Sequence, residues 1–295
     1  MKLSVLLAIS FLPLSGWDKC SFVQKNPSLS SMQSEFSHLN LKNRVERFLS
    51  FLSDGKYKVV FLGMKEYPNL LSQMENPPFR LCYRGSLPVS DEPLVSLCGT
   101  RFPDLCAGQA SYAFALEAGS NGVGIVTSHS RGIDRAALYA CNDAHAKAYV
   151  CCDCGLSSPR IQNNELLEKM NLISPFEPDD AALKYRCLSR NVLTVGLSPH
   201  LLVIQAPEKS GALNCATNAL DLGRDVYVHA TGIRDRTVNE GSIRLYQEGA
   251  IAVEGYDQLA RYIHFPCGNT VHATHDERSL YRYGNTWYSL SYDDQ

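Results

Sequence analysis

The sequence lacks an apolar run long enough to cross a membrane, a strong excess of charge and a regular cysteine pattern. No stretch reaches the roughly 20 apolar residues that a membrane span requires. Lysine plus arginine number 28 against 30 aspartates and glutamates, so any affinity for nucleic acid must come from a local cluster rather than a cationic coat. The eleven cysteines are irregularly spaced, and several stand inside apolar runs. This usage favours reduced, core-filling thiols and a cytoplasmic protein over a disulfide framework.

The usual marks of catalysis and metal binding are missing as well. There is no Gly-x-Ser-x-Gly elbow and no cysteine with an identifiable base. Residues 151–154 (Cys-Cys-Asp-Cys) have no second Cys-x-x-Cys to complete a tetrahedral zinc site, so a strand end is the better interpretation. Residues 119–124 are rich in glycine, but they end a predicted helix and precede a strand, the reverse of the order in a dinucleotide-binding turn. We expect a protein that is not an enzyme and uses no metal or cofactor.

The first 60 residues are predicted to form a small helical segment. Residues 3–14 are an apolar run that resembles a short signal peptide, but only Lys2 supplies a positive charge before it and no Ala-x-Ala pattern follows. The apolar positions recur at helical spacing, which favours a first helix. Leu41–Leu52 shows an amphipathic pattern and predicts another helix, whereas the serines of residues 28–34 predict a polar connection.

Further along the chain, short apolar runs alternate with helical patterns. The predicted strands cover residues 94–98, 123–127, 146–151, 171–174, 200–205, 225–229 and 250–253. The predicted helices cover residues 104–118, 133–143, 163–170, 189–197, 212–222, 240–248 and 256–262. This alternation predicts an α/β fold with a doubly wound, mostly parallel sheet. We place this domain at residues 61–265, after the helical segment at 1–60 and before a polar tail at 266–295.

Glycine-bearing turns follow some of these strands and form the strongest functional signal. The clearest are residues 98–101 (Cys-Gly-Thr-Arg), 127–134 (Thr-Ser-His-Ser-Arg-Gly-Ile-Asp) and 209–212 (Lys-Ser-Gly-Ala). In a parallel sheet such turns emerge on one rim, where ligands bind. Small residues let the backbone approach a ligand, and the N–H groups of the following helix starts favour anions. The pattern therefore predicts a phosphate-binding rim.

Cations and aromatic residues accompany these turns. We expect the cations to face the rim; they are Arg101, Arg131, Lys184, Arg186, Arg190 and Lys209. Phe102 and Tyr185, each beside a cation, are the candidates for base stacking, although Phe102 could equally belong to the core. His129 is the histidine best placed for acid–base chemistry, but an imidazole that only bonds phosphate or backbone is the more frequent case in such a turn.

Taken in order, the motifs resemble the DprA/Smf family, the DNA-processing proteins of bacterial natural transformation. Single motifs are weak, but their order and spacing over about residues 60–260 make the resemblance specific. They are Tyr67-Pro68-Asn69-Leu70-Leu71, Asn76-Pro77-Pro78, Leu81-Cys82-Tyr83-Arg84-Gly85, Cys98-Gly99-Thr100-Arg101, Arg131-Gly132-Ile133-Asp134, Arg190-Asn191 with Gly196-Leu197-Ser198, Ser210-Gly211-Ala212-Leu213, Gly223-Arg224 and Gly249-Ala250.

The resemblance implies an extended Rossmann-like fold, a homodimer, binding of single-stranded DNA, and transfer of that DNA to the RecA recombinase. By the family's motifs, Arg101 and Lys184 hold DNA phosphates, and the two glycine turns supply backbone donors. The DNA- or phosphate-binding set expected here is Gly99, Arg101, Ser128, Arg131, Gly132, Lys184, Arg190, Asn191, Ser210 and Gly211.

Several positions depart from the family pattern. They are Thr127-Ser128 for the family's serine-glycine, Leu138 for a histidine, Val192 for the second arginine of Arg-Asn-Arg, His229-Ala230-Thr231 for Val-Pro-Gly, and Ile243 for an asparagine. A nucleotide-binding sensor or a nucleotide hydrolase of a related Rossmann-like family is the alternative. Its Pro-Gly-Gly-x-Gly-Thr-x-x-Glu motif is missing here. A structural partner protein with a vestigial ligand site is a third interpretation.

Overall fold

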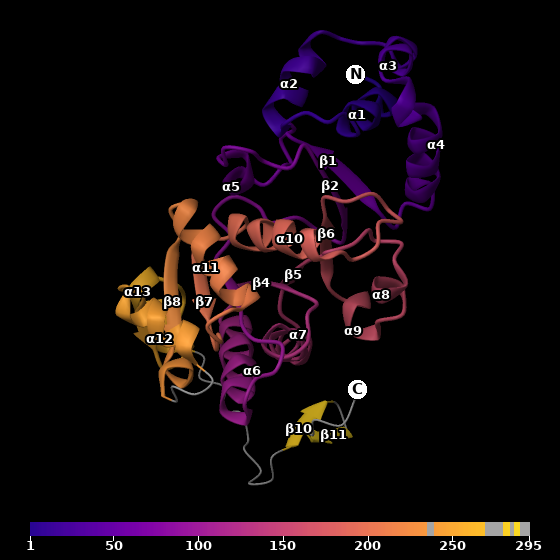
Figure 1. Ribbon diagram of the computed structural model, residues 1–295. Helices are drawn as coiled ribbons and strands as arrows, with labels where there is room; N and C mark the ends of the chain where they lie inside the picture. Colours follow the sequence, from indigo (N-terminus) through magenta and orange to yellow (C-terminus); the bar gives the residue numbers. More distant parts are fainter. Residues whose placement is uncertain (235–238, 269–279, 284–285, 290–295) are drawn as a thin grey trace. The chain divides into compact units, whose positions relative to one another are not determined.

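The computed structural model describes residues 1–234, 239–268, 280–283 and 286–289 (Figure 1). The chain packs as two units that are discontinuous in sequence. Unit 1 comprises Met1–Asp91 and Cys151–Leu197, and unit 2 comprises Glu92–Val150 and Ser198–Gln295. The contiguous boundaries expected at residues 60 and 265 stay a prediction.

Unit 1 begins with helices that gather around α1. In chain order they are α1 (Leu3–Ser10), α2 (Gly16–Gln24), α3 (Leu29–Glu35), the 3-10 turn η1 (Ser37–Leu39) and α4 (Leu41–Leu52). α1 contacts α2, α3 and α4, and its residues 6–9 are buried. Phe48 of α4 is buried beside them, and its ring lies 6.2 Å from that of Phe11. The helical segment expected over residues 1–60 is therefore present, with the apolar run as its first helix.

An antiparallel sheet of β1 (Lys58–Phe61), β2 (Arg80–Arg84) and β6 (Asn171–Ser174) completes unit 1, in the order β1-β2-β6. Cys82 of β2 pairs with Val59 on one side and Ser174 on the other. The remaining elements are α5 (Asn69–Ser72), α8 (Pro159–Gln162), α9 (Glu165–Glu168) and α10 (Lys184–Gly196). Chain segments about 90 residues apart thus share one sheet.

Unit 2 is the doubly wound part of the fold. Its strands are β3 (Leu94–Cys98), β4 (Gly124–Ser128), β5 (Ala148–Cys151, whose last residue belongs to unit 1), β7 (His200–Val203), β8 (Asp225–His229) and β9 (Ile251–Val253). Their order is β5-β4-β3-β7-β8-β9, and the pairings from β4 to β9 are parallel. β3 and β4 are buried along their whole length, as central strands of a parallel sheet are.

Helices connect these strands. They are α6 (Leu105–Ser120), α7 (Ile133–Asp143), α11 (Gly211–Asp221), the 3-10 turn η2 (Ala230–Ile233), α12 (Glu240–Gln247) and α13 (Tyr256–Ile263). α6 and α7 pack together against β4, and α11 packs against β7 and β8. The alternation confirms the predicted α/β class with a mostly parallel sheet. A hairpin of β10 (Leu280–Tyr283) and β11 (Thr286–Ser289) lies within the predicted tail.

Some predicted elements were misplaced. Residues 28–34, expected to be a polar connection, belong to α3 and its N-cap Ser28, because the Ser28 hydroxyl accepts the Ser31 N–H at 3.0 Å and Met32 is buried. Of the helix expected at 163–170, only residues 165–168 are helical, as α9, and a second short helix, α8, lies just before the predicted range. Asn163 ends α8 and Asn164 precedes α9, so these two residues separate the short helices.

All eleven cysteines are free thiols, and most are buried. Cys98, Cys151 and Cys215, which stand in apolar runs, are each at most 5% exposed. Burial raises the pKa of the Cys141 thiol to about 12. The buried cysteines thus fill the core as small apolar groups, as the sequence predicted, whereas Cys106 and Cys267 are exposed.

Candidate phosphate-binding site

The glycine turns of unit 2 lie side by side because the strands that carry them are neighbours. β3 stands between β4 and β7, and all run parallel, so the turns emerge at the same rim. The Thr100 N–H donates to the Gln205 carbonyl at 2.8 Å, and the Thr100 carbonyl accepts the Ile133 N–H at 3.2 Å. The turn after β3 is therefore bonded to the segments that follow both neighbouring strands.

Two glycines permit this close approach. Gly132 has φ +76°, and a Cβ there would lie 2.4 Å from the Thr100 carbonyl oxygen. A Cβ at Gly99 would lie 2.5 Å from the Ile133 side chain at the start of α7. Both glycines are predicted site residues, and the structure places them where turn meets turn. Their absent side chains allow the neighbouring turns to pack closely against one another.

The cations of these turns point to solvent. Arg101 and Arg131 are exposed, and so is Lys209 ahead of α11. Within the described part of the chain none of the three forms an ion pair, so their charge is not neutralised by a neighbouring carboxylate. Phe102 is 69% exposed and therefore does not belong to the core. The rim of unit 2 presents uncompensated positive charge beside backbone turns.

The turn after β4 is held by its own hydroxyls. Ser128 is buried, and its Oγ accepts the Ser130 N–H at 3.0 Å and donates to the Asp134 carboxylate. His129 in the same turn is only 7% exposed. The Ser128 hydroxyl therefore shapes the turn, which leaves the backbone and the exposed Arg131 side chain as the parts of residues 128–132 suited to an anion.

The turn after β7 leads into α11. The Ser210 hydroxyl caps this helix by accepting the Leu213 N–H at 3.3 Å, and Gly211 is its exposed first residue. A helix start carries a partial positive charge, which favours anions. Ser210 and Gly211 are thus at the position that the sequence predicted.

A buried polar network behind the rim was missed by the sequence analysis. The Gln205 side-chain amide donates to the Asp104 carboxylate at 2.6 Å and to the Asn239 Oδ1 at 2.7 Å. Asp104 also caps α6 by accepting the Ala107 N–H at 2.8 Å. The only sequence signals were an aspartate ahead of a helix and a glutamine ending an apolar strand. This network ties the start of α6 to the end of β7 and supports the turn between them.

His229 stands at the end of β8, where the family's Val-Pro-Gly is replaced. Its Nδ1 accepts the Thr231 N–H at 3.2 Å, which caps the short turn η2. Burial lowers the pKa of His229 to about 4. The imidazole is therefore neutral near pH 7 and acts as a structural acceptor.

The other predicted site residues belong to α10 in unit 1. Lys184 is the first residue of this helix, five residues before the predicted start at residue 189, and it is exposed. Arg186 pairs with Asp180. Arg190 and Asn191 are 6% and 5% exposed, unlike Lys184. Within unit 1, Lys184 is thus the predicted cation that is presented to solvent without an ion pair.

Comparison with known proteins identifies the family. The sequence model described as "DNA recombination-mediator protein A" matches residues 58–264, more than half of the chain. The chain belongs to the DprA/Smf family. A Smf protein of Borreliella burgdorferi is 31% identical over 211 residues, covering 69% of this chain and 66% of that protein. The chain thus spans just under two thirds of that relative.

Two further relatives are DNA processing proteins DprA. The one from Streptococcus pneumoniae is 29% identical, covering 66% of this chain and 71% of that protein. The one from Bacillus subtilis is also 29% identical, covering 72% of this chain and 76% of that protein. The motifs quoted from the sequence lie inside the matched range, so the resemblance drawn from them is confirmed.

Solved structures agree on the fold. The crystal structure of the S. pneumoniae protein has a TM-score of 0.70 at 23% identity, covering 90% of this chain and 95% of that one. DNA processing protein A of Helicobacter pylori, described for its single-stranded DNA binding mode, has a TM-score of 0.61 at 22% identity, covering 70% of this chain and 95% of that one. The extended Rossmann-like fold is therefore confirmed. Among the described residues, no helix has the length and apolar character to cross a membrane.

Proposed function

We propose that this family member binds single-stranded DNA through its phosphates and does not cleave it. The main support for this proposal is that the turns after β3, β4 and β7 are joined by hydrogen bonds. They present Arg101, Arg131 and Lys209, which have no neutralising partners among the described residues. Lys184 would add a phosphate contact from unit 1. Gly99, Ser128, Gly132, Ser210 and Gly211 would shape the backbone of the site. Arg190 and Asn191, the other members of the expected set, are buried in α10.

The physics of this rim suits a flexible polyanion. Arginine and lysine release condensed counterions when they contact phosphates, so the affinity should fall with salt. Backbone turns and point charges carry no pattern that reads base edges, so little sequence preference is expected. Unstacked bases are available only in single strands, and the exposed rings of Phe102 and Tyr185 could stack on them.

The biological setting follows from the family alone. We propose that the chain acts in the cytoplasm, in DNA uptake during transformation or in recombination. There it would protect incoming DNA as a homodimer and pass it to the RecA recombinase. The H. pylori protein supports the DNA ligand, because it is described as binding single-stranded DNA.

A titration tests the ligand. Fluorescence anisotropy should compare a labelled oligo-dT, a duplex of equal length and competition by mononucleotides. Tighter binding of oligo-dT than of duplex, with salt-dependent affinity, is the expected result. Equal or tighter binding of duplex would contradict the proposal. Displacement of the oligonucleotide by mononucleotides at similar concentrations would instead indicate a nucleotide sensor.

A further inference from the structure

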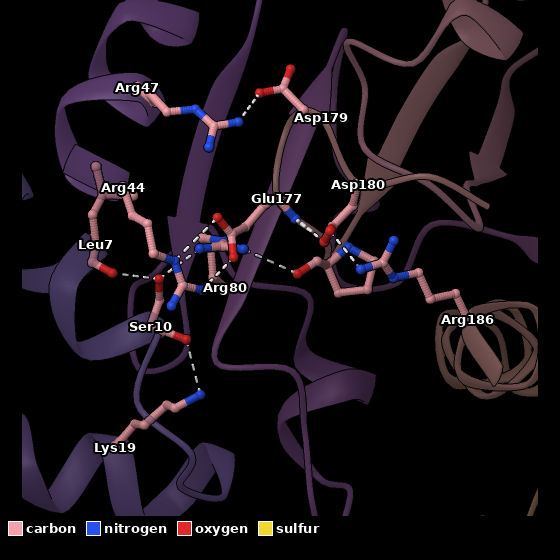
Figure 2. A network of polar contacts seen from close by, with 11 residues as sticks. Leu7, Ser10, Lys19, Arg44, Arg47, Arg80, Glu177, Asp179, Asp180 and Arg186 are labelled. Carbon is pink, nitrogen blue, oxygen red and sulfur yellow. Dashed lines mark hydrogen bonds and ion pairs between the residues drawn. The ribbon is translucent and has the colours of Figure 1, made fainter. Parts of the chain in front are cut away.

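The loop between β6 and α10 carries an acidic stretch whose carboxylates form ion pairs with arginines of two different helices. Figure 2 shows Arg44 and Arg47 of α4 reaching Glu177 and Asp179, and Arg186 of α10 reaching Asp180. All these residues belong to unit 1. We call residues 177–180 the acidic loop. It joins the N-terminal helices to the helix that begins with Lys184.

Asp180 organises this loop. One carboxylate oxygen accepts the Glu177 N–H at 2.9 Å, and the other accepts from the Arg186 guanidinium. The Asp180 backbone carbonyl accepts the Gly155 N–H at 2.8 Å. The Arg186 side chain is only 13% exposed and also donates to the Ala181 carbonyl. Such charge-assisted bonds fix geometry better than neutral ones.

Glu177 lies near a cluster of cations formed by Arg44, Arg80 and Lys19. Its carboxylate pairs with Arg44, while the buried Arg80 donates to the Ser10 hydroxyl at 2.6 Å (Figure 2). The Arg80 guanidinium also lies over the Phe48 ring, 4.6 Å from its centroid. Lys19 donates to the Ser10 carbonyl at 3.0 Å. Burial, followed by repulsion from Arg80 and Arg44, lowers the pKa of Lys19 to about 8. Glu177 is thus the carboxylate in direct contact with this cationic cluster.

The start of α10 depends on this loop because it has no cap of its own. Its N-cap residue is Leu183, which offers no side-chain acceptor, and its first turn contains no acidic residue. A helix start without a capping side chain frays unless tertiary contacts hold it. Asp180 supplies such a contact through Arg186, two residues after Lys184.

We propose that Glu177 and Asp180 are positioning residues for the DNA contact of Lys184. They transmit the packing of the N-terminal helices to the first turn of α10. The inference rests on the proposed function for the role of Lys184. Neither carboxylate touches DNA; each holds the backbone from which the Lys184 ammonium reaches a phosphate.

Removing a carboxylate charge separates the two explanations, because electrostatics and positioning predict opposite changes in DNA affinity. Glu177→Gln and Asp180→Asn each remove a negative charge, so long-range electrostatics alone would tighten DNA binding slightly. Positioning predicts the opposite, a loss of about three- to tenfold in oligo-dT affinity. Glu46→Gln is the matched control, because Glu46 is exposed on α4 and makes the same charge change. It should leave affinity equal or slightly tighter.

A second readout does not depend on DNA. Hydrogen exchange of peptides covering residues 184–192 should become faster in Glu177→Gln and Asp180→Asn than in the wild type or Glu46→Gln, with melting temperatures recorded to confirm folding. Unchanged exchange in both variants overturns the proposal, and so does equal or tighter binding by both when the wild type binds oligo-dT. If the wild type does not bind, the proposed function fails while the exchange result still decides whether the loop fixes α10. Should Glu177→Gln not fold, Asp180→Asn decides alone.

Discussion

Replacing Gly132 with alanine tests whether the turns of unit 2 touch as described. Gly132 has φ +76° and ψ −127°, a region that is almost restricted to glycine. An added Cβ would lie 2.4 Å from the Thr100 carbonyl oxygen and 2.7 Å from the Arg101 carbonyl carbon. These are backbone atoms, so relief requires the whole turn after β3 to move.

The cost has two parts that a control separates. The unfavourable φ and ψ cost about 1–3 kcal/mol, and displacing a packed backbone costs about 1–3 kcal/mol more. Gly223→Ala is the control, since Gly223 has φ +66° and an added Cβ would meet nothing within 4 Å. It should cost about 1 kcal/mol. The free energy of unfolding should therefore fall by about 2–6 kcal/mol in Gly132→Ala.

Thermal unfolding provides the assay. At about 2–4 °C per kcal/mol, Gly132→Ala should melt roughly 4–24 °C below the wild type and Gly223→Ala roughly 2–4 °C below it. If the two variants melted within about 2 °C of one another, the backbone contact between the turns would be absent and the reasoning would be refuted.

Further predictions concern single residues. Lys184→Ala should weaken oligo-dT binding and reduce the log–log salt slope by about 0.7, measured over about a fourfold salt range, whereas Lys42→Ala on α4 should leave the slope unchanged. Tyr185→Ala should weaken oligo-dT binding by about 1–3 kcal/mol without changing the salt slope, because Tyr185 is 58% exposed and is proposed to stack on a base rather than to contact a phosphate. An equal effect on duplex binding would argue against stacking. Because burial lowers the pKa of His229 from 6.5 to about 4, the unfolded chain takes up this proton first. Stability should be full above about pH 6.5 and fall as the pH falls toward 4, and His229→Asn should flatten that dependence in melting scans.

Local signals explain why much of the fold could be predicted. α4 and α7 have the predicted bounds, since each carries an amphipathic pattern. β6 and β8 also match, because apolar runs bounded by polar residues identify buried strands. The glycine turns were found for the same reason: their residues follow strands directly, and parallel strands end on one rim.

The missed features depend on contacts between distant residues. α10 begins five residues before its predicted start, at Lys184, because no capping residue marks that position and Arg186 pairs there with Asp180 of the acidic loop. The pairing of β2 with β6 joins residues about 90 positions apart, which no local pattern reveals. Gln205 had no visible role until Asp104 and Asn239 were placed beside it. The burial of Arg190 could not be predicted either, since Lys184, six residues earlier on the same helix, is exposed.

The affinity of Arg101→Ala for single-stranded DNA tests the central claim most directly. Arg101 is exposed, and no ion pair with a described residue holds it, so its removal should leave the melting temperature within about 2 °C of the wild type. Its loss should weaken oligo-dT binding by about tenfold or more, since an arginine can bond a phosphate through two N–H groups. Arg261→Ala, in the last turn of α13, removes the same charge away from the rim and should change affinity little. Unchanged affinity in Arg101→Ala, or equal losses in both variants, would contradict a phosphate site at these turns.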